Sequence, residues 1–572
     1  AHGCNLYMRS YPGFLEAMEK FSLRDFARLF ELEKLVVRNF KSLRSFELSF
    51  PTRVTVVAGP NGSGKTALVE ALELLKDVQE WARGRTANPF SKWWGYRNVV
   101  YQHDETRSIT IGLKLKLSRE KLEEKLRAAE RDRELEATTE EEVRSSARDL
   151  MGLLGRALRF LGANELSVYY EVSLNGRHKF SAEDEVFKLK AGSLSVDGSF
   201  AKKKFSIDIN LCELLKLENA ILKMKSALSA DAPDREELYR RVVGIVESLC
   251  TEDWFRSVYR PTIEYSELLT ETLAYIYDRF GKSINWYDTL IDIFQEMITD
   301  SIHEALEKRK ETLISYLGSN AKLPDLSKGA ESIGGLVLKA LAEVARMSAF
   351  ESAVAITGAA VGVWEFIEGV VVLRGVKSSE LKTPQPLTRE EALRSDGSNL
   401  APYLYTITEG RVPREVEGAL EYVLEGCEEV KLGMPVTDDG RVYISIQVDG
   451  VKLLPPSQPD GALKALLVEA ALLSKPSVIA IDEFENSLHP LAQQFLLDEV
   501  RSSGAYAVIT THSPVVLDYL KRLDELVLLK WERGETRALR AKSPEELKSW
   551  LAELGLTTSE ALLSGLMLGK LE

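Results

Sequence analysis

The pattern of apolar and polar positions predicts a helix followed by the first strands of an α/β domain. Apolar side chains recur at helical spacing in Arg9–Phe30, which indicates an amphipathic lead-in helix. Leu32–Phe40 and Leu43–Phe50 then alternate between apolar and polar residues, as two paired strands do. Val54–Ala58 is short, uncharged and rich in β-branched residues, and a glycine-rich turn separates it from a helix over Lys65–Leu75. The order strand, loop, helix is typical of the start of a parallel sheet.

In the middle of the chain, helical and charge-rich segments outnumber strands. Only Ser108–Leu117 and Ser167–Leu174 look like strands. Arg119–Arg148 carries alternating charge and an apolar seam too short for a coiled coil, so we predict one solvated helix. Glu213–Leu249 and Tyr265–Leu317 have the periodicity of further helices.

Short strands return in the last third of the chain, separated by helical stretches. They are Val370–Leu373, Val442–Val448, Val478–Ile481, Ala507–Thr511 and Leu526–Leu529. The last of these and Thr536–Ala541 flank Arg533–Gly534 and predict a hairpin. Strands that alternate with helices indicate an α/β fold with a largely parallel sheet and antiparallel β additions.

Composition and charge limit the class of protein. Of the 572 residues, 45% are hydrophobic and 28% charged, as in soluble proteins with full cores. The formal net charge of −13 excludes a uniformly basic coat for nucleic acid. Four cysteines lie far apart without a C-x-x-C pair, which favours a reducing compartment, and the N-terminal pattern is not that of a secretion signal. We therefore expect a cytoplasmic protein.

One uncharged stretch, Ser352–Trp364, raises the question of a membrane span. It has 13 residues, fewer than the roughly 20 that cross a bilayer, and Glu365 and Glu368 follow it. We predict a buried helix that leads into the strand Val370–Leu373, and no contact with a membrane.

The turn after Val54–Ala58 fits a phosphate-binding loop. It matches G-x-x-x-x-G-K-[ST] in full and lies between a buried strand and a helix, as the mechanism requires. The candidate nucleotide-binding residues are Gly59, Pro60, Asn61, Gly62, Ser63, Gly64, Lys65 and Thr66. Backbone N–H groups of such a loop turn toward the phosphates, and Lys65 can reach the β- and γ-phosphates. The Thr66 hydroxyl can bind Mg²⁺, so ATP and Mg²⁺ are the expected ligands.

Two further motifs follow strands late in the chain. Val478–Ile481 ends in Asp482 and Glu483. In a protein with a phosphate-binding loop, the first carboxylate at such a strand end helps to hold Mg²⁺, and the second is placed to act as a general base toward water. His512 follows the next predicted strand and can hydrogen-bond to the γ-phosphate; the alternative is a structural histidine.

These positions predict one discontinuous nucleotide-binding domain. Its N-terminal lobe covers residues 31–100 and its C-terminal lobe residues 366–572. Residues 1–30 form the helical lead-in, and residues 101–365 form a mostly helical insertion with a few strands. The lysine and the paired acids are about 400 positions apart, and the hypothesis requires them to meet at one Mg·ATP.

Together, the motifs resemble the RecF/SMC-like branch of the ABC ATPases. The resemblance rests on N-F-K-S at Asn39–Ser42, GPNGSGKT, IDEFENSLHP and TTHSP. It is strongest to the predicted-ATPase (AAA) group that includes the overcoming-lysogenization-defect (OLD) proteins, which Ser395–Ile407 and the C-terminal ELGLTTSEALLSGLMLG also resemble. It covers roughly residues 30–75 and 366–572, and the insertion matches no family that we can name.

The resemblance implies roles for further residues. Asp482 and Glu483 would be the Walker B pair, and His512 the switch histidine. Glu485–Pro490 would be the D-loop, with Asn486 and His489 facing a partner subunit.

The ABC signature departs from the pattern of the group. The group usually has S-D-G before a helix, whereas this chain has Pro459, Asp460 and Gly461. Proline offers phosphate neither a hydroxyl nor an N–H, so we expect weak activation in trans. Asp460 is expected to cap the helix, and the N–H groups around Gly461 to point at a γ-phosphate across a dimer. Gln102 is an open candidate for the Q-loop ligand of Mg²⁺.

The leading hypothesis is an ATPase that works as a nucleotide-dependent homodimer. Its insertion would pass closure on to DNA or a protein partner, and the resemblance implies DNA repair, genome maintenance or defence against foreign DNA. The alternative is a slow nucleotide switch or scaffold without DNA contact, which Pro459 and the acidic charge favour. OLD-type nucleases carry a TOPRIM domain after the ATPase motifs, and the 60 residues after His512 are too few for one. Short basic clusters at residues 202–204, 240–241 and 308–310 are interpreted as solvated faces.

Overall fold

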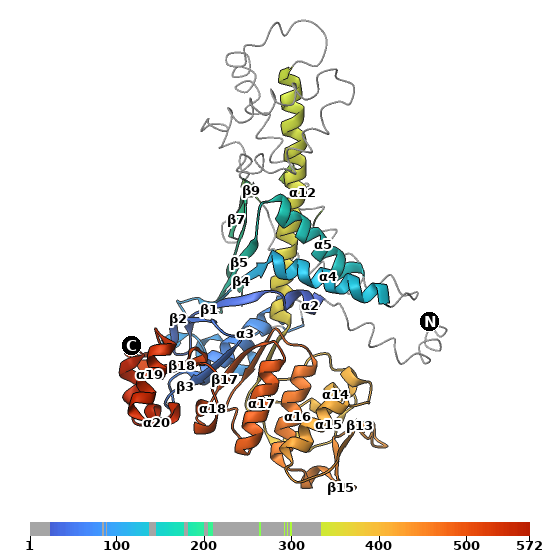
Figure 1. The fold of residues 1–572 in the computed structure, drawn as a ribbon, viewed down its shortest axis with the longest axis vertical. Coiled ribbons are helices and arrows are strands. Elements are labelled where there is room, and N and C mark those ends of the chain that lie inside the picture. Colours follow the sequence, from blue (N-terminus) through green and yellow to red (C-terminus); the bar gives the residue numbers. More distant parts are fainter. Residues whose placement is uncertain are drawn as a thin grey trace, which may run out of the picture. The chain divides into compact units, whose positions relative to one another are not determined.

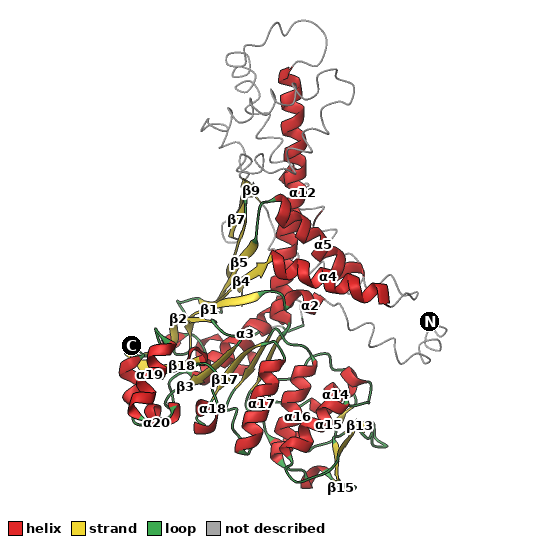
Figure 2. Cartoon of the chain, viewed as in Figure 1, coloured by secondary structure: helices red, strands yellow, loops and turns green. Residues whose placement is uncertain are grey.

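The computed structural model divides into two compact units (Figures 1 and 2). It describes residues 23–82, 85–86, 88–135, 145–176, 181–199, 204–209, 262–264, 291, 295, 298–299 and 333–571. Unit 1 comprises Ala1–Glu31, Lys114–Val172 and Ala182–Trp364. Unit 2 comprises Leu32–Leu113, Ser173–Ser181 and Glu365–Glu572. Both units are therefore discontinuous in sequence.

The centre of unit 2 is a six-stranded sheet in the order β10-β16-β17-β3-β18-β19. The strands are β3 (Val54–Ala58), β10 (Val370–Leu373), β16 (Val478–Ile481), β17 (Tyr506–Thr510), β18 (Leu526–Glu532) and β19 (Glu535–Leu539). Neighbours from β10 to β18 are parallel, and β19 is antiparallel to β18. Only β17 separates the strand before the phosphate-binding loop from the strand before Asp482.

Helices cover both faces of this sheet because its strands alternate apolar side chains between the two faces. Val56, Ile481 and Ile509 belong to one core cluster with the apolar residues of α16 (Asp460–Leu473) and α17 (Pro490–Ser502). The helix α3 (Lys65–Ala82) packs instead on β10, β16 and β17. Figure 1 shows α16 and α17 side by side. The fold is α/β with mixed sheets.

Two predicted hairpins are confirmed in unit 2. β1 (Glu31–Phe40) pairs antiparallel with β2 (Leu43–Ser49). β18 and β19 are joined by Arg533 and Gly534, whose φ angles of 50° and 89° are those of the type I′ turn that suits the strand twist. β19 also lies beside β2, which brings the two hairpins together.

The single strand predicted over Val442–Val448 is wrong. The structure has two short strands, β13 (Arg441–Val442) and β14 (Ser445–Val448), because each pairs with a different neighbour. β13 pairs with β11 (Gln385–Pro386), and β14 lies between β12 (Val430–Gly433) and β15 (Val451–Leu453). Further helices of unit 2 are α13 (Ser378–Leu381), α14 (Leu400–Thr408), α15 (Arg414–Val423), α18 (Pro514–Asp518), α19 (Pro544–Leu554) and α20 (Thr558–Leu563).

In unit 1, the solvated helix predicted over Arg119–Arg148 is also wrong. The chain forms α4 (Arg119–Leu135), and α5 (Ser145–Phe160) contains Arg148. The thin seam of α4 is buried against α5, where a side chain added at Gly155 would meet Leu122 and Leu126 at 3.9 Å. A seam too short for a coiled coil is thus long enough to pack on one neighbouring helix.

The rest of the described insertion contains strands as well as helices. β4 (Ile109–Ser118) and β5 (Glu165–Asn175) cross between the units along the chain. β6 (Ser181–Ala191), β7 (Leu194–Ser199), β8 (Lys204–Ile209) and β9 (Thr262–Glu264) pair antiparallel in sequence order. The helices predicted over residues 213–249 and 265–317 lie almost entirely outside the described residues, as does the lead-in helix apart from α2 (Leu23–Ala27).

The uncharged stretch Ser352–Trp364 is part of the long helix α12 (Ile333–Glu368). Within α12, Met347–Glu368 is long and apolar enough to cross a bilayer, but 89% of its most apolar window is buried inside the fold. The core helices of soluble proteins have the same composition. The prediction of a buried helix that leads into β10 is confirmed.

Candidate functional site

The carboxyl ends of the parallel strands meet at one edge of the unit 2 sheet. Leu373 pairs with Ile481, and Thr510 pairs with Val57. The segments that leave these strands are the phosphate-binding loop, the Asp482–Glu483 pair and the His512 turn, and they therefore start at the same edge. Open α/β sheets bind their ligands at this edge.

Lys65 and the paired acids come together there. The ammonium group of Lys65 donates hydrogen bonds to the carbonyl oxygens of Gly59 (2.9 Å) and Pro60 (3.0 Å), inside its own loop. Burial lowers the pKa of Lys65, and the nearby carboxylates of Asp482, Glu485 and Glu483 oppose this shift. Lys65 and the three carboxylates, about 400 positions apart in the sequence, thus lie within electrostatic range of one another.

A threonine of β19 supports the phosphate-binding loop from behind. Thr536 Oγ1 lies 2.9 Å from the carbonyl oxygen of Ser63 and 2.7 Å from the hydroxyl of Ser42. Gly64 has a φ of +101°, and a Cβ there would lie 2.3 Å from Thr536 Oγ1, so this position requires glycine. Among the residues that the structure describes, the buried Ser63 hydroxyl has no hydrogen-bond partner, which suits a loop built to receive an anion. Nothing in the sequence distinguished Thr536, because its role depends on the pairing of β18 and β19.

Thr510 holds the two acids after β16. Its hydroxyl donates to Asp482 Oδ1 (2.5 Å) and accepts the backbone N–H of Glu483 (2.9 Å). Glu483 has a φ of +50°, unusual for a residue with a side chain and typical of functional sites. Its carboxylate accepts a hydrogen bond of 2.7 Å from Asn486 Nδ2. Asp482 is only 9% exposed. The hydrogen bonds with Thr510 and Asn486 thus hold both acids in place.

Glu485 joins this segment to the His512 turn. Its carboxylate accepts hydrogen bonds from the Thr511 hydroxyl (2.8 Å) and from the backbone N–H of His512 (2.7 Å). The side chain of His512 is exposed at the same edge of the sheet. A shift of either segment therefore displaces the other.

The residues at this edge fit a magnesium ion that is bound together with phosphate. Magnesium is usually held by one or two protein oxygens together with water and substrate phosphates. Thr66, on the first turn of α3, exposes a hydroxyl, and Asp482 supplies a carboxylate. In the described part of the chain, no three His, Cys, Asp or Glu side chains gather as a metal cage. Thr66 and Asp482 offer the small number of protein oxygens that suits magnesium bound together with a nucleotide.

The expectation that Asp460 caps α16 is wrong. Asp460 is the first residue of the helix, and the capping position belongs to Pro459, which makes no side-chain cap. The Asp460 carboxylate instead pairs with Lys382 at 2.7 Å, because a charged partner binds it more strongly than a backbone N–H does. This hydrogen bond to Lys382 is the main reason why the pKa of Asp460 is lowered. Gly461 touches the D-loop: a Cβ there would lie 2.7 Å from the carbonyl oxygen of Ser487.

Gln102 lies on a short 3-10 turn, Tyr101–His103, with its side chain exposed and a φ of +55°. A hydrogen bond of 2.6 Å from the Lys41 N–H to the Val99 carbonyl places this segment beside the end of β1. Among the described residues, no hydrogen bond joins Gln102 to the phosphate-binding loop or to Asp482. Its role as a Q-loop ligand stays a prediction.

The sequence matches known proteins over the segments that build this edge. Residues 31–310 match the family described as "AAA ATPase domain", and residues 438–518 match "AAA domain, putative AbiEii toxin, Type IV TA system". The DNA replication and repair protein RecF of Psychromonas ingrahamii is 48% identical over 44 residues. The chromosome partition protein Smc of Methanocaldococcus jannaschii is 39% identical over 67 residues. Over these segments, the chain is similar to RecF/SMC-like ATPases of the ABC type.

The matches to the two relatives are short. They cover 8% of this chain and 12% of the RecF protein, and 12% of this chain and 6% of the Smc protein. A solved Smc head domain from Pyrococcus furiosus, bound to the C-terminal domain of ScpA, aligns over 92% of this ATPase and 99% of that chain with 11% identity and a TM-score of 0.34. The similarity to RecF/SMC-like ATPases rests on the sequence matches.

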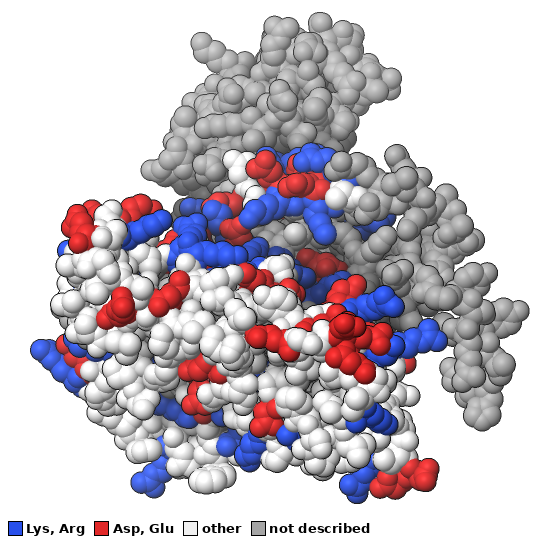
Figure 3. All heavy atoms as spheres, turned by 60° about the horizontal axis from the view of Figure 1, so that its bottom comes forward, with Lys and Arg blue, Asp and Glu red and all other residues white. Residues whose placement is uncertain are grey.

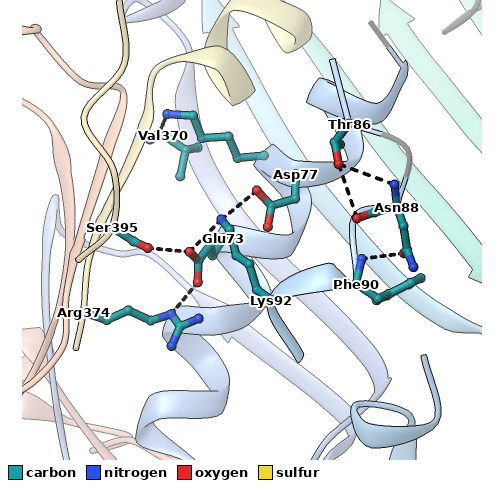
Figure 4. A network of polar contacts seen from close by, with 10 residues as sticks. Glu73, Asp77, Thr86, Asn88, Phe90, Lys92, Val370, Arg374 and Ser395 are labelled. Carbon is teal, nitrogen blue, oxygen red and sulfur yellow. Dashed lines mark hydrogen bonds and ion pairs between the residues drawn. The ribbon is translucent and has the colours of Figure 1, made fainter. Parts of the chain in front are cut away.

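A charge network around the buried Glu73 links the first and last segments of unit 2 (Figure 4). Glu73 of α3 accepts hydrogen bonds from Ser395 (2.6 Å), Lys92 (2.9 Å) and Arg374, which directly follows β10. Lys92 also pairs with Asp77 at 2.9 Å. The network fixes the helix of the phosphate-binding loop to the C-terminal segments of the unit. Its residues were not singled out from the sequence, because each has partners in distant segments.

Within this network, we expect Asp77→Asn to stabilise the ATPase at neutral pH. Burial raises the pKa of Asp77 to about 6 although Lys92 opposes the shift. Its buried Oδ2 has no hydrogen-bond partner within the described part of the chain. The folded state therefore holds this proton more tightly than the unfolded state, and ionised Asp77 costs stability above about pH 6 but not below about pH 4. The variant should gain about 1–3 kcal/mol in the free energy of unfolding at pH 7.5.

Urea denaturation of the variant and the wild type at pH 7.5 and pH 4.5 checks this prediction. The gain should shrink as the pH falls through the window between the unfolded and folded pKa values. A loss of stability at pH 7.5, or a gain of equal size at both pH values, would show that the charge of Asp77 is not costly.

Proposed function

We propose that this ATPase binds Mg·ATP on Gly59–Thr66 and hydrolyses it as part of a nucleotide-dependent dimer. The observation that supports the proposal most is the meeting of Lys65 with Asp482 and Glu483 at one edge of one sheet. A cation on a phosphate-binding loop opposite two anchored acids is the arrangement that phosphoryl transfer to water requires.

Nucleotide binding is assigned to the loop and to β16. Lys65 exchanges the carbonyl oxygens of Gly59 and Pro60 for oxygens of the β- and γ-phosphates, and backbone N–H groups at the start of α3 point at the same charge. Thr66 and Asp482 would hold Mg²⁺. When bound, the metal offsets the negative charge of the phosphates.

Hydrolysis is assigned to the segments that follow β16 and β17. Glu483, kept in place by Asn486, accepts the proton of the attacking water. His512 hydrogen-bonds to the γ-phosphate, and its position depends on Glu485. Because the protein forms no covalent bond to phosphate, its whole contribution is positioning and charge stabilisation.

The biological setting follows from the resemblance. Two chains would close head to tail, with Asp460 and Gly461 of one chain near the ATP of the other. A cytoplasmic role in DNA repair, genome maintenance or defence against foreign DNA agrees with the name of the RecF relative, a DNA replication and repair protein. The face in Figure 3 carries acidic and basic side chains together, so a DNA contact would depend on a local basic area.

Steady-state ATPase rates with and without duplex DNA test the proposal. We expect turnover that requires Mg²⁺ and rises when DNA is added. The experiment should be repeated at low and moderate salt, because phosphate contacts weaken as salt increases. Undetectable turnover under all these conditions would contradict the proposal.

One observation favours a second function, a slow nucleotide switch or scaffold without DNA contact. Pro459 occupies the signature position, and Asp460 is already paired with Lys382 of its own chain. Both features weaken the contribution of one chain to the ATP of the other. ATP-dependent dimerisation with turnover below detection would select this alternative, whereas DNA-stimulated turnover would exclude it.

A further inference from the structure

Three hydrogen bonds close a ring around the carboxylate of Glu73 (Figure 4). The hydroxyl of Ser395 donates to Glu73 Oε1 (2.6 Å), and the Nε–H of Arg374 donates to Glu73 Oε2. The backbone N–H of Arg374 donates in turn to the carbonyl oxygen of Ser395 (2.8 Å). Both carboxylate oxygens are therefore held by residues that follow β10 in the chain. We call Glu73, Arg374 and Ser395 the Glu73 clamp.

Arg374 extends the clamp to a second buried acid of α3. Its Nη1 lies 3.4 Å from Glu70 Oε1, which also accepts a hydrogen bond from Trp93 Nε1 (3.0 Å). The other oxygen of Glu70 pairs with Lys41. Buried carboxylates need such partners, and a guanidinium group can contact two of them at once through different nitrogens. Arg374 thus binds α3 at two positions about one turn apart.

The two acids share a face of α3 with the proposed metal ligand Thr66. Residues four and seven positions apart lie on the same side of a helix, and the residues four and seven positions after Thr66 are Glu70 and Glu73. The helix is continuous from Lys65 to Ala82. The contacts that fix the two acids therefore also fix the first turn of α3, which carries the Thr66 hydroxyl.

On its other side, the clamp adjoins the second proposed metal ligand, Asp482. Arg374 directly follows Leu373, whose carbonyl oxygen accepts the backbone N–H of Asp482 (2.9 Å). Leu373 also pairs with Ile481 in the parallel register of β10 and β16. Two connections thus start at Arg374: one leads through α3 to Thr66, and the other leads through the end of β10 to Asp482.

Magnesium makes the separation of these two ligands important. The ion requires nearly ideal octahedral geometry with oxygens at about 2.0–2.1 Å, so a small shift of one ligand weakens binding. Thr66 and Asp482 are about 400 positions apart in the sequence, and tertiary contacts must therefore set the distance between them. The Glu73 clamp is such a contact, because it joins the helix of one ligand to the strand beside the other.

We propose that Arg374 is a positioning residue for magnesium, which holds Thr66 and Asp482 at the separation that one Mg²⁺ bound with ATP requires. The inference rests on the proposed function and adds to it a residue outside the nucleotide-binding motifs. In this role, Arg374 acts through Glu70 and Glu73 on one ligand and through the end of β10 on the other.

A second connection between α3 and β10 provides the matched control. Lys76 Nζ donates a hydrogen bond to the carbonyl oxygen of Val370 (3.0 Å), at the start of β10 and away from the carboxyl edge of the sheet. Lys76→Met therefore weakens the contact between the same helix and the same strand, but at the end remote from the proposed metal ligands. If Arg374 only held α3 on the sheet, Arg374→Met and Lys76→Met would have similar effects.

Calorimetric titration of the full chain with a non-hydrolysable ATP analogue, once with Mg²⁺ and once with EDTA, tests the inference. The ratio of the two affinities is the gain from Mg²⁺, and it is measured without turnover. We expect Arg374→Met to bind the analogue in EDTA within about threefold of the wild type and to lose about tenfold of the gain, as when groups that support metal ligands are removed. Arg374→Lys should recover part of the gain, because an ammonium group can still pair with one acid. Lys76→Met should keep the wild-type gain.

The outcomes separate the inference from the proposed function. A wild-type gain from Mg²⁺ in Arg374→Met would overturn the inference and leave the proposed function intact. An equal loss of the gain in Arg374→Met and Lys76→Met would also overturn it. If Arg374→Met does not fold, Arg374→Lys decides the question: a reduced gain supports the inference and a wild-type gain overturns it. No gain from Mg²⁺ in the wild type would instead refute the metal site of the proposed function and the inference together.

Discussion

Lys65→Ala should abolish measurable ATP binding. In the nucleotide-bound state, the ammonium group replaces its hydrogen bonds to Gly59 and Pro60 with charge-assisted bonds to phosphate. Such bonds contribute about 1.5–3 kcal/mol each, and the loss of two weakens binding by at least about a hundredfold. Isothermal titration calorimetry with ATP and Mg²⁺ measures the effect directly.

The control for this experiment is Lys452→Ala, which removes an exposed lysine far from the loop in sequence. Its affinity for ATP should equal that of the wild type. Unchanged ATP affinity in Lys65→Ala would refute the assignment of Gly59–Thr66 as the nucleotide-binding loop.

Glu483→Gln should separate binding from hydrolysis. Glutamine keeps an oxygen that can accept the hydrogen bond from Asn486, so the segment keeps its shape. It cannot accept the proton of water, and general-base catalysis contributes about 10²–10⁴-fold to a rate. We therefore expect kcat to fall by about that factor, while ATP binds within a few-fold of the wild-type affinity.

The same variant should accumulate the closed dimer when ATP is added, because the step that opens the dimer is blocked. Light scattering during an ATP titration reports the mass, and Glu553→Gln on the exposed side of α19 serves as the control. A kcat of Glu483→Gln close to the wild-type value would assign the base to another residue. A mass that stays at one chain at saturating ATP would contradict the proposed dimer.

The elements whose signals are local were predictable from the sequence. Local sequence patterns predict the strand Val54–Ala58, the glycine-rich turn and the start of α3. The dipeptide Arg533–Gly534 likewise predicts a hairpin, and both residues have the positive φ angles that its turn requires. The strands β16 and β17 were found because buried parallel strands are short apolar runs. These elements place the phosphate-binding loop and the paired acids at one edge of the sheet.

The contacts that complete the site were not predictable, because each depends on strand order or helix packing. Thr510 acts on Asp482 only because β16 and β17 are neighbours, and Thr536 reaches Ser63 only because β19 is the last strand of the sheet. The sequence pattern predicts Asp460 as a helix cap, but it does not show that Lys382 lies beside this residue in the fold.

The central claim is that segments about 400 positions apart share one Mg·ATP. An experimental structure of the Glu483→Gln chain with ATP and Mg²⁺ tests it most directly, since this variant should retain the nucleotide. The account predicts the γ-phosphate beside Lys65 and a metal ion bound by both the Thr66 hydroxyl and the Asp482 carboxylate. A nucleotide bound elsewhere, or a metal ion held by only one of these two segments, would contradict it.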